Sequence, residues 1–424
     1  MFNKSLEDVT EEDLQALIDV KTETQKIERK TVEYKQCLSP SEDKSDCSEN
    51  TLNRSRDKIE FLADVSSFAN TVGGYLLYGV EADAGLPIKL VGVKIDADKQ
   101  KQQMENLLRD NIEPRLPYVD IQVVPLRSKP GYSVIILHIR QSWLGPHRVN
   151  REGHAHFYVR NSNGKNQLDI AQIRAAFELS GSIADRIRNF RAERLGRIIA
   201  GDELPAILDE GAPKLVLHMI PSSAFNPAVS IDMKVFNDYS NWDLMRPLAV
   251  WDLQPPTSTR FNLDGIARSV QWTRNAAEPV AAPSGYVQIF RNGIVEAVDI
   301  TILSVNGNKK QFLGEVFELR LLQAVKKHME LQQFLGVEPP VFIMVSLLGV
   351  RGYKIDRGGY PSNYTEEIDR TNLIIPEVIL DTFDAGNDHI AEVMRPVFDT
   401  TWNTANYPSS PNYDEGGKYL RGWN

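Results

Sequence analysis

The stretch Ser66–Val80, SSFANTVGGYLLYGV, places the tightest constraint on what this chain can fold into. Apolar residues recur at helical spacing upstream of it and predict a helix over residues 57–70. Gly73-Gly74 ends this helix, because glycine adopts a left-handed conformation without a steric penalty. A buried strand over residues 75–80 follows at once. Its Gly79 indicates a position where a side chain would clash with a neighbouring part of the fold. The loops at both ends of that strand are where we look for chemistry.

The residues around this stretch predict a mixed α/β domain. Asp57 and Glu60 have the spacing of a capping box at the start of the helix. Glu33 and Lys35 share one face of a short strand over residues 31–36, because side chains alternate with a period of two. Further helices and strands are expected at residues 88–95, 97–111, 118–125, 132–140, 155–160 and 169–179.

The length of 424 residues favours two to three domains. Asn292-Gly293 predicts a hairpin, and a long helix over residues 312–335 precedes an apolar run typical of a buried strand. These features predict a second mixed α/β domain, so the whole chain belongs to the α/β class (mixed α+β). The predicted division is an N-terminal helix, a first domain, an arginine-rich helical connector, a C-terminal α/β domain of unknown role and a flexible tail, at residues 1–21, 22–180, 181–212, 213–402 and 403–424.

Composition and motif content exclude several classes of protein. The formal net charge of −9 argues against general polyanion binding, so any nucleic-acid contact needs a local basic patch. The N-terminus lacks a signal-peptide core, and no apolar run approaches the roughly 20 residues that span a bilayer. Cys37 and Cys47 are too few for a disulfide framework and show no metal-ligand spacing. No phosphate-binding loop, nucleophile elbow or H-E-x-x-H motif is present, so no nucleotide cofactor is expected. We expect a cytoplasmic protein without a membrane segment.

Acidic residues gather on both sides of the central strand. Glu33 and Lys35 lie on one strand face, Glu28 lies upstream, and Glu81 and Asp83 follow residues 75–80 directly. If strand 31–36 lies beside strand 75–80, these carboxylates converge. Such oxygen ligands suit Mg²⁺ or Mn²⁺, which could activate water against a phosphodiester while Lys35 assists at the oxyanion. The same Glu/Lys alternation is also typical of a solvated strand face.

A second group of residues is basic. It surrounds the Gly145-Pro146 break and has Trp143 within it, a combination that suits phosphate contact and base stacking. The alternative is an ordinary charged loop. The candidate nucleic-acid-binding residues are Arg140, His147, Arg148, Arg151, Arg160 and Lys165. His154 and His156 share a strand face, but a lone pair of histidines is more often structural than a metal site.

Together these residues resemble the Schlafen AlbA_2 domain over roughly residues 22–180. The resemblance rests on Glu33-Tyr34-Lys35 (the E-[FY]-K motif), the SFANTVGGYLLYGV block, the acidic turn after it, Pro146-His147, and residues 157–160. It implies a mixed α/β domain that pairs into a two-lobed nucleic-acid clamp. Because only one copy is visible here, such a clamp would require a homodimer. The zinc motif and the helicase portion of Schlafens are absent.

Some Schlafens are metal-dependent endoribonucleases that cut tRNA and rRNA. Their acidic triad, carried over to this chain, falls on Glu28, Glu33 and either Glu81 or Asp83. The resemblance thus implies a divalent-metal-dependent endoribonuclease that acts on RNA, tRNA among it, with Mg or Mn as cofactor and a role in antiphage defence. Bacterial relatives without a functional triad imply the alternative, a non-catalytic nucleic-acid-binding transcriptional regulator that binds DNA. A third reading is an interaction protein whose AlbA_2 domain only dimerises.

Overall fold

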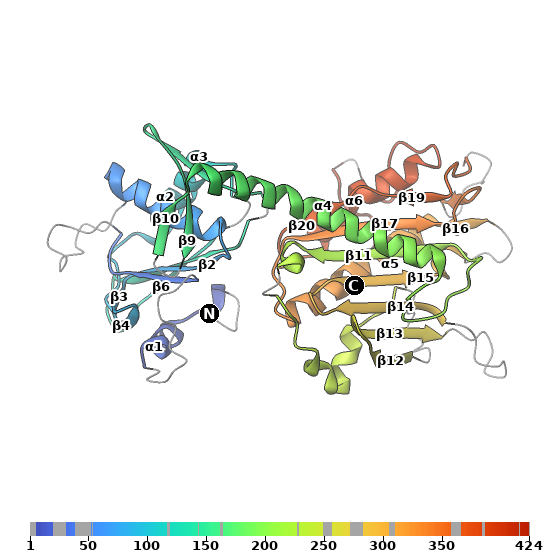
Figure 1. The fold of residues 1–424 in the computed structure, drawn as a ribbon, viewed down its shortest axis with the longest axis horizontal. Helices are drawn as coiled ribbons and strands as arrows, with labels where there is room; N and C mark the ends of the chain where they lie inside the picture. The colour runs from blue at the N-terminus through green and yellow to red at the C-terminus, as the bar shows by residue number, and fades with distance from the viewer. Residues whose placement is uncertain are drawn as a thin grey trace. The chain divides into compact units, whose positions relative to one another are not determined.

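The computed structural model divides the chain into two compact units, residues 1–183 and 184–424 (Figure 1). Each unit has its own hydrophobic core. The overall class is α/β, as predicted. The structure describes residues 6–19, 31–38, 52, 54–116, 119–142, 144–161, 164–226, 229–248, 257–271, 283–304, 310–357, 366–383, 386–414 and 416–423.

The first unit contains short strands and three helices before the long helix α4, which continues into the second unit. Its elements are η1 (Leu6–Asp8), α1 (Glu11–Asp19), β1 (Val32–Lys35), α2 (Ser55–Ala69), β2 (Gly74–Tyr78), β3 (Val80–Asp83), β4 (Leu86–Leu90), α3 (Ala97–Asn111), β5 (Ile112–Glu113), β6 (Val119–Pro125), β7 (Ser133–Ile139), β8 (Arg148–Arg151), β9 (His154–Asn161), β10 (Gly164–Gln167) and α4 (Ile170–Ala200).

The central strand β2 lies beside β1, as the sequence predicts. The order of this sheet is β1-β2-β7-β6, with β1 parallel to β2 and Glu33 opposite Leu76. The glycines before β2 are required sterically, because a Cβ on Gly73 would lie 2.6 Å from the Ile139 carbonyl oxygen and one on Gly74 would lie 2.3 Å from that of Thr31. The chain can therefore turn from α2 into β2 only with glycine at both positions.

Two apolar layers cover the two faces of this sheet. Phe61, Leu62 and Phe68 of α2 pack with Met104 of α3 on one face. Leu14 of α1 packs with Val32 and Tyr34 on the other face. A second sheet, β10-β9-β8-β5, lies against α2. This arrangement leaves Glu33 and Lys35, which alternate with Val32 and Tyr34, on the α2 side of β1.

Three local predictions were wrong in the first unit. The helix α2 begins at Ser55 with Arg54 as its N-cap and no side-chain cap, so Asp57 and Glu60 form no capping box. Residues 164–167, where no helix or strand was predicted, form the strand β10, which pairs with β9. The helix expected at 169–179 and the arginine-rich connector are a single helix, α4. Cys37 is disulfide-bonded, which the sequence did not predict.

The second unit is a large sheet with helices on both faces. Its elements after α4 are β11 (Lys214–Pro221), η2 (Ser222–Phe225), η3 (Met233–Asn237), η4 (Tyr239–Leu244), β12 (Thr257–Phe261), β13 (Gly265–Gln271), β14 (Pro283–Phe290), β15 (Val295–Asp299), η5 (Ile302–Ser304), β16 (Gln311–Leu313), α5 (Gly314–Phe334), β17 (Val341–Leu348), β18 (Lys354–Asp356), β19 (Asn372–Ile374), β20 (Val378–Leu380) and α6 (Asn387–Asn403).

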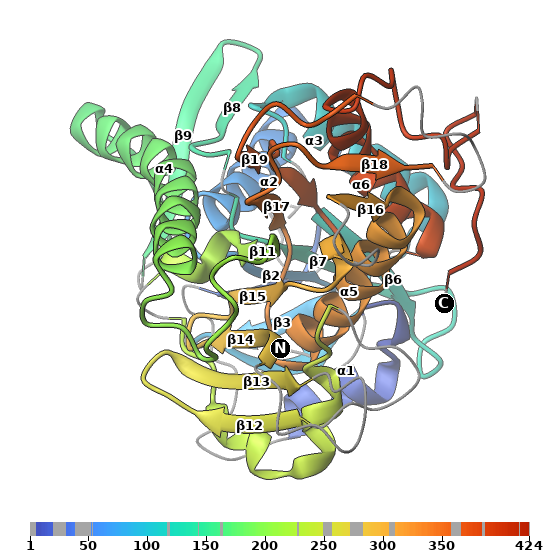
Figure 2. The same cartoon turned by 90° about the vertical axis from the view of Figure 1, so that its right-hand side faces the viewer.

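The sheet order is β12-β13-β14-β15-β11-β17-β19, with β20 also pairing β17. The predicted hairpin at Asn292-Gly293 joins β14 and β15. The apolar strands β11 and β17 are neighbours in this sheet. Alternation along β11 directs Leu215 and Leu217 to the core that α5 and α6 share, and Val216 to the core that α4 covers. Figure 2 shows α4 and α5 on opposite sides of these strands.

The arginine-rich part of α4 is bonded to the second unit through ion pairs. Arg194 forms a bidentate pair with the fully buried Glu296, with both nitrogen–oxygen distances 2.8 Å, and His218 lies 2.9 Å from the same carboxylate. Arg188 bonds Glu377 at 2.7 Å. These arginines are therefore explained by packing within the unit and need no phosphate partner.

The expectation of a flexible tail does not fit the packing of residues 404–423. Tyr413, Tyr419 and Trp423 are buried in the core of the second unit. Glu318 of α5 accepts hydrogen bonds from Trp402 of α6 at 2.7 Å and from two tail side chains, at 2.6 Å from Ser410 and at 2.9 Å from Asn412. The proline-rich, polar composition of this segment favoured a flexible tail in sequence analysis, although its aromatic side chains pack in the core.

Candidate nucleic-acid interface

The predicted pair Glu33 and Lys35 lies at the centre of a buried set of charges between β1, α2 and the β9–β10 hairpin. Lys35 Nζ lies 2.8 Å from Glu33 Oε1, and the Arg160 guanidinium bonds Glu33 Oε2. The Arg160 side chain is only 3% exposed and lies over the Phe68 ring at 4.2 Å. Arg160, predicted as a phosphate contact, therefore serves as the partner of Glu33.

Two carboxylates of α2 complete this set, and sequence analysis missed both as site residues. Asp64, whose side chain is 2% exposed, lies 2.8 Å from Lys165 Nζ and 3.4 Å from Lys35 Nζ. Glu60 lies 2.8 Å from Lys165 Nζ. The signal was present, because Asp64 is an acidic residue within the apolar face of a predicted helix. We call these residues the ion cluster: Glu33, Lys35, Glu60, Asp64, Arg160 and Lys165.

The electrostatics of the ion cluster keep Glu33 ionised. Burial alone would raise the pKa of Glu33, but Lys35 and Arg160 outweigh it and lower that pKa. Burial would lower the pKa of Lys35, but Asp64 and Glu33 raise it well above its ordinary value. Asp64 differs, because its burial raises the pKa in spite of the two neighbouring ammonium groups. The cluster is thus a charge-balanced network in which Asp64 and Arg160 are buried and Glu60 is exposed to solvent.

Of the remaining predicted carboxylates, the two that the structure describes, Glu81 and Asp83, do not join this network. Glu81 and Asp83 lie on β3, which pairs with β4 so that Glu81 is opposite Lys89. Glu28 lies outside the described residues. Within the part of the chain that the structure describes, no group of three or more His, Cys, Asp or Glu side chains is arranged to hold a metal ion.

The ion cluster does not fit a divalent cation either. Three carboxylates, those of Glu33, Glu60 and Asp64, face three cations, those of Lys35, Arg160 and Lys165. A metal ion would need to displace these cations from oxygens that they already neutralise, and a displaced Arg160 would be left charged and buried. The chemistry of the donor set therefore favours a structural role for the described carboxylates.

The other predicted basic residues are also paired. Arg140 bonds Asp120 at 3.0 Å and Arg148 bonds Glu113 at 2.7 Å. His147 is fully buried, its Nδ1 lies 2.6 Å from the Pro114 carbonyl oxygen, and burial lowers its pKa. The predicted basic patch is thus largely used within the fold.

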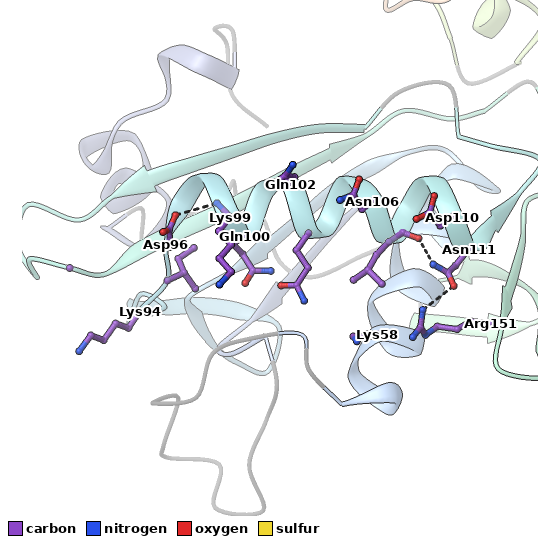
Figure 3. A pocket seen from close by; sticks show the side chains of 14 residues that line it. Lys58, Lys94, Asp96, Lys99, Gln100, Gln102, Asn106, Asp110, Asn111 and Arg151 are labelled. Atoms are coloured by element: carbon purple, nitrogen blue, oxygen red, sulfur yellow. Dashed lines mark hydrogen bonds between the residues drawn. The ribbon is translucent and has the colours of Figure 1, made fainter.

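A groove beside α3 is lined by polar groups, among them Arg151, which sequence analysis named as a nucleic-acid-binding residue (Figure 3). Sequence analysis did not single out the other lining residues. The groove has a volume of about 1150 Å³. Gln100 is 3% exposed, and among the described residues neither its Nε2 nor the Nε of Arg151 has a hydrogen-bond partner. We call it the α3 groove, and it is lined by Lys58, Lys94, Ile95, Asp96, Lys99, Gln100, Gln102, Gln103, Asn106, Leu107, Asp110, Asn111, Gly131 and Arg151.

The lining of the α3 groove is dominated by hydrogen-bond donors. Four cations and two acids line the groove. Arg151 is ion-paired at 2.7 Å with Glu152, which lies outside the lining, so three lysines remain as its other cations. One of the acids, Asp96, is the N-cap of α3, where it accepts from the Lys99 backbone at 3.2 Å. Five amide side chains supply further donors and acceptors. The groove is therefore suited to an anionic ligand with many acceptor oxygens, which the sugar-phosphate backbone of a nucleic acid is.

The family match with known proteins falls within the first unit. Residues 28–169 match the family model of the Schlafen AlbA_2 domain. The α3 groove and the ion cluster lie within this AlbA_2 domain. No curated protein matches the chain. Among the described residues, no helix has the length and apolarity to cross a membrane.

Two solved structures have low similarity to about a third of the chain. One is the DIP2311 protein from Corynebacterium diphtheriae, with 16% identity and a TM-score of 0.25, matched over 33% of this chain and 25% of its own. The other is the N-terminal domain of a RecG-related protein from Nitrosomonas europaea, with 18% identity and a TM-score of 0.23, matched over 34% of this chain and 85% of its own. This chain thus spans a quarter of the DIP2311 protein, and these scores are too low to transfer a function.

Proposed function

We propose that the AlbA_2 domain is a non-catalytic nucleic-acid-binding module and that the strand lies along the α3 groove. The observation that carries this proposal is the donor-rich lining of the groove, with the buried, unpartnered amide of Gln100. The match to a family often associated with nucleic acids supports it. The total charge of −9 does not oppose it, because the cations of the groove are local.

The test compares lysines that line the α3 groove with one that does not. Fluorescence anisotropy is measured with labelled single-stranded and duplex RNA and DNA at several salt concentrations. Lys94→Ala/Lys99→Ala is expected to weaken binding and to reduce the salt slope by about 2, since each lost phosphate contact contributes about 1. Lys101→Ala is the matched control, because Lys101 is an exposed lysine of α3 outside the groove lining. The proposal would be contradicted if the two variants lost the same amount of affinity, or if the wild type bound none of the nucleic acids.

The finer activity that the resemblance implies is metal-dependent cleavage of tRNA or rRNA. It would require Glu33 to exchange its cation partners, Lys35 and Arg160, for a metal, and the ion cluster argues against this exchange. The direct test is incubation of the full chain with tRNA and rRNA in Mn²⁺ or Mg²⁺. We expect intact RNA, and cleavage that Glu33→Gln abolishes in a protein that is still folded would replace the non-catalytic proposal with the nuclease.

A further inference from the structure

A second cavity in the AlbA_2 domain lies between α2 and the β9–β10 hairpin, apart from the α3 groove. Its volume of about 480 Å³ is within the range of roughly 300–1,000 Å³ in which small ligands bind. It shares no lining residue with the α3 groove. The cavity is lined by Ser55, Arg56, Ile59, Glu60, Ala63, His154, Tyr158 and Lys165.

The strand β9 supplies two aromatic rings to this cavity. His154 and Tyr158 lie on the same face of the strand, with ring planes 11° apart and centroids 6.0 Å apart. The His154 Nε2 and the Tyr158 hydroxyl are 2.5 Å apart, which fixes one ring against the other. Tyr158 also packs against the core of the domain. The two rings therefore form a fixed platform.

The rest of the cavity combines an apolar floor with charge at the rim. Ile59 and Ala63 of α2 provide the apolar surface. Lys165 is bonded to Glu60 and Asp64, so it is already neutralised within the ion cluster. Arg56 is exposed in the first turn of α2. This guanidinium is the cation best placed to meet an anionic group that accompanies a ligand.

Aromatic rings with a neighbouring cation are the arrangement that binds an unpaired base and its phosphate. A base stacks on the rings irrespective of its sequence, and the guanidinium neutralises the backbone. Burial, followed by the neighbouring His156, lowers the pKa of His154, so its ring is neutral at physiological pH. A neutral platform with a single exposed cation at its rim favours a flat, weakly polar group over a second phosphate.

We propose that this cavity binds one unpaired nucleobase of a single-stranded nucleic acid, stacked on His154 and Tyr158, with the adjoining phosphate at Arg56. The inference rests on the proposed function, because it assumes that the AlbA_2 domain binds a strand. It adds a preference that the α3 groove alone does not give: an unpaired base over a paired one.

The test uses the full chain and ten-nucleotide RNA and DNA strands that carry one 2-aminopurine, each alone or annealed to a complement. Stacking quenches 2-aminopurine fluorescence, so binding of the single strand by the wild type should lower the emission. His154→Ala should abolish the added quenching and weaken single-strand binding roughly 5- to 150-fold, the range for one stacked base. Duplex binding should change less than about twofold, as duplex bases are not available to the cavity.

Two further variants separate stacking from a general loss of structure. His154→Phe keeps an aromatic ring and should retain most of the quenching. Phe157→Ala is the matched control, because Phe157 is an aromatic residue of the same strand that packs against Phe177 and does not line the cavity. The inference is wrong if His154→Ala binds the single strand and quenches its fluorescence like the wild type. It is also wrong if His154→Phe binds the single strand as weakly as His154→Ala. In both cases the proposed function still stands. If the wild type binds neither strand nor duplex, both fail together.

Discussion

Replacement of Glu33 should destabilise the first unit. Glu33 is the only described residue that pairs with the Arg160 side chain, which is 3% exposed and whose Nε and Nη1 have no hydrogen-bond partner. Removing one partner of a buried pair costs about 3–5 kcal/mol, because the other charge stays buried. Glu33 is 19% exposed, so water can reach part of the gap and we expect the lower end, about 3 kcal/mol, for Glu33→Ala.

Hydrogen exchange of peptides from β1 and β9 measures this loss of stability in the first unit alone, because those peptides contain no residue of the second unit. Glu81→Ala is the matched control, since Glu81 lies outside the ion cluster, and it should stay within about 0.5 kcal/mol of the wild type. A double variant, Glu33→Met/Arg160→Met, should recover part of the loss because no unpaired charge remains. The reasoning is refuted if Glu33→Ala is as stable as Glu81→Ala, or if the double variant is less stable than Glu33→Ala.

Three further predictions concern other parts of the chain. Glu318→Ala removes the acceptor of three hydrogen bonds and should lower the free energy of unfolding by about 3 kcal/mol or more, seen as faster chymotrypsin cleavage within residues 404–423. Burial would raise the pKa of Glu296, but hydrogen bonds from its partners lower it to about 2, below its ordinary 4.5. The ionised Glu296 therefore stabilises the fold fully above about pH 4.5, and this contribution is lost as the pH falls toward 2. When the free energy of unfolding is measured against pH, it should fall less steeply in Glu296→Gln than in the wild type. Gly73→Ala should lower the melting temperature more than Gly131→Ala. Both glycines have a positive φ, but only at position 73 would the added Cβ lie 2.6 Å from the Ile139 carbonyl oxygen.

The sequence predicted the elements with strong periodicity or turn chemistry. The helix at residues 97–111 was predicted with its observed bounds. Gly73-Gly74 was predicted to end the preceding helix, but α2 ends at Ala69 with Asn70 as a right-handed C-cap. The two glycines are needed for another reason, because a Cβ at either position would clash with a backbone carbonyl oxygen. Asn292-Gly293 marked its hairpin because this dipeptide suits a turn with positive φ, and Gly293 has a φ of 84°. These signals depend on a few neighbouring residues, so one sequence is enough to detect them.

The partners of the charged residues could not be predicted, because they depend on contacts far apart in the chain. Arg160 and Glu33 are 127 residues apart in sequence, and neither shows from its neighbours that the other is its partner. Lys165 likewise pairs with Asp64, about 100 residues away. A local cluster of basic residues therefore predicted a nucleic-acid surface where the fold pairs most of the same charges with acidic side chains, of which Asp64 is buried.

The packing of the last described residues has a practical consequence for anyone who shortens this protein. Residues 404–423 have the composition of a flexible tail. That composition would suggest ending the protein at residue 403 to remove a disordered segment. Because Tyr413, Tyr419 and Trp423 belong to the core that α5 and α6 share, such a cut would expose apolar surface instead. The shortened protein should aggregate, whereas the intact segment should resist carboxypeptidase digestion inward of Trp423, whose carbonyl oxygen accepts a hydrogen bond from Asn387 at 2.7 Å.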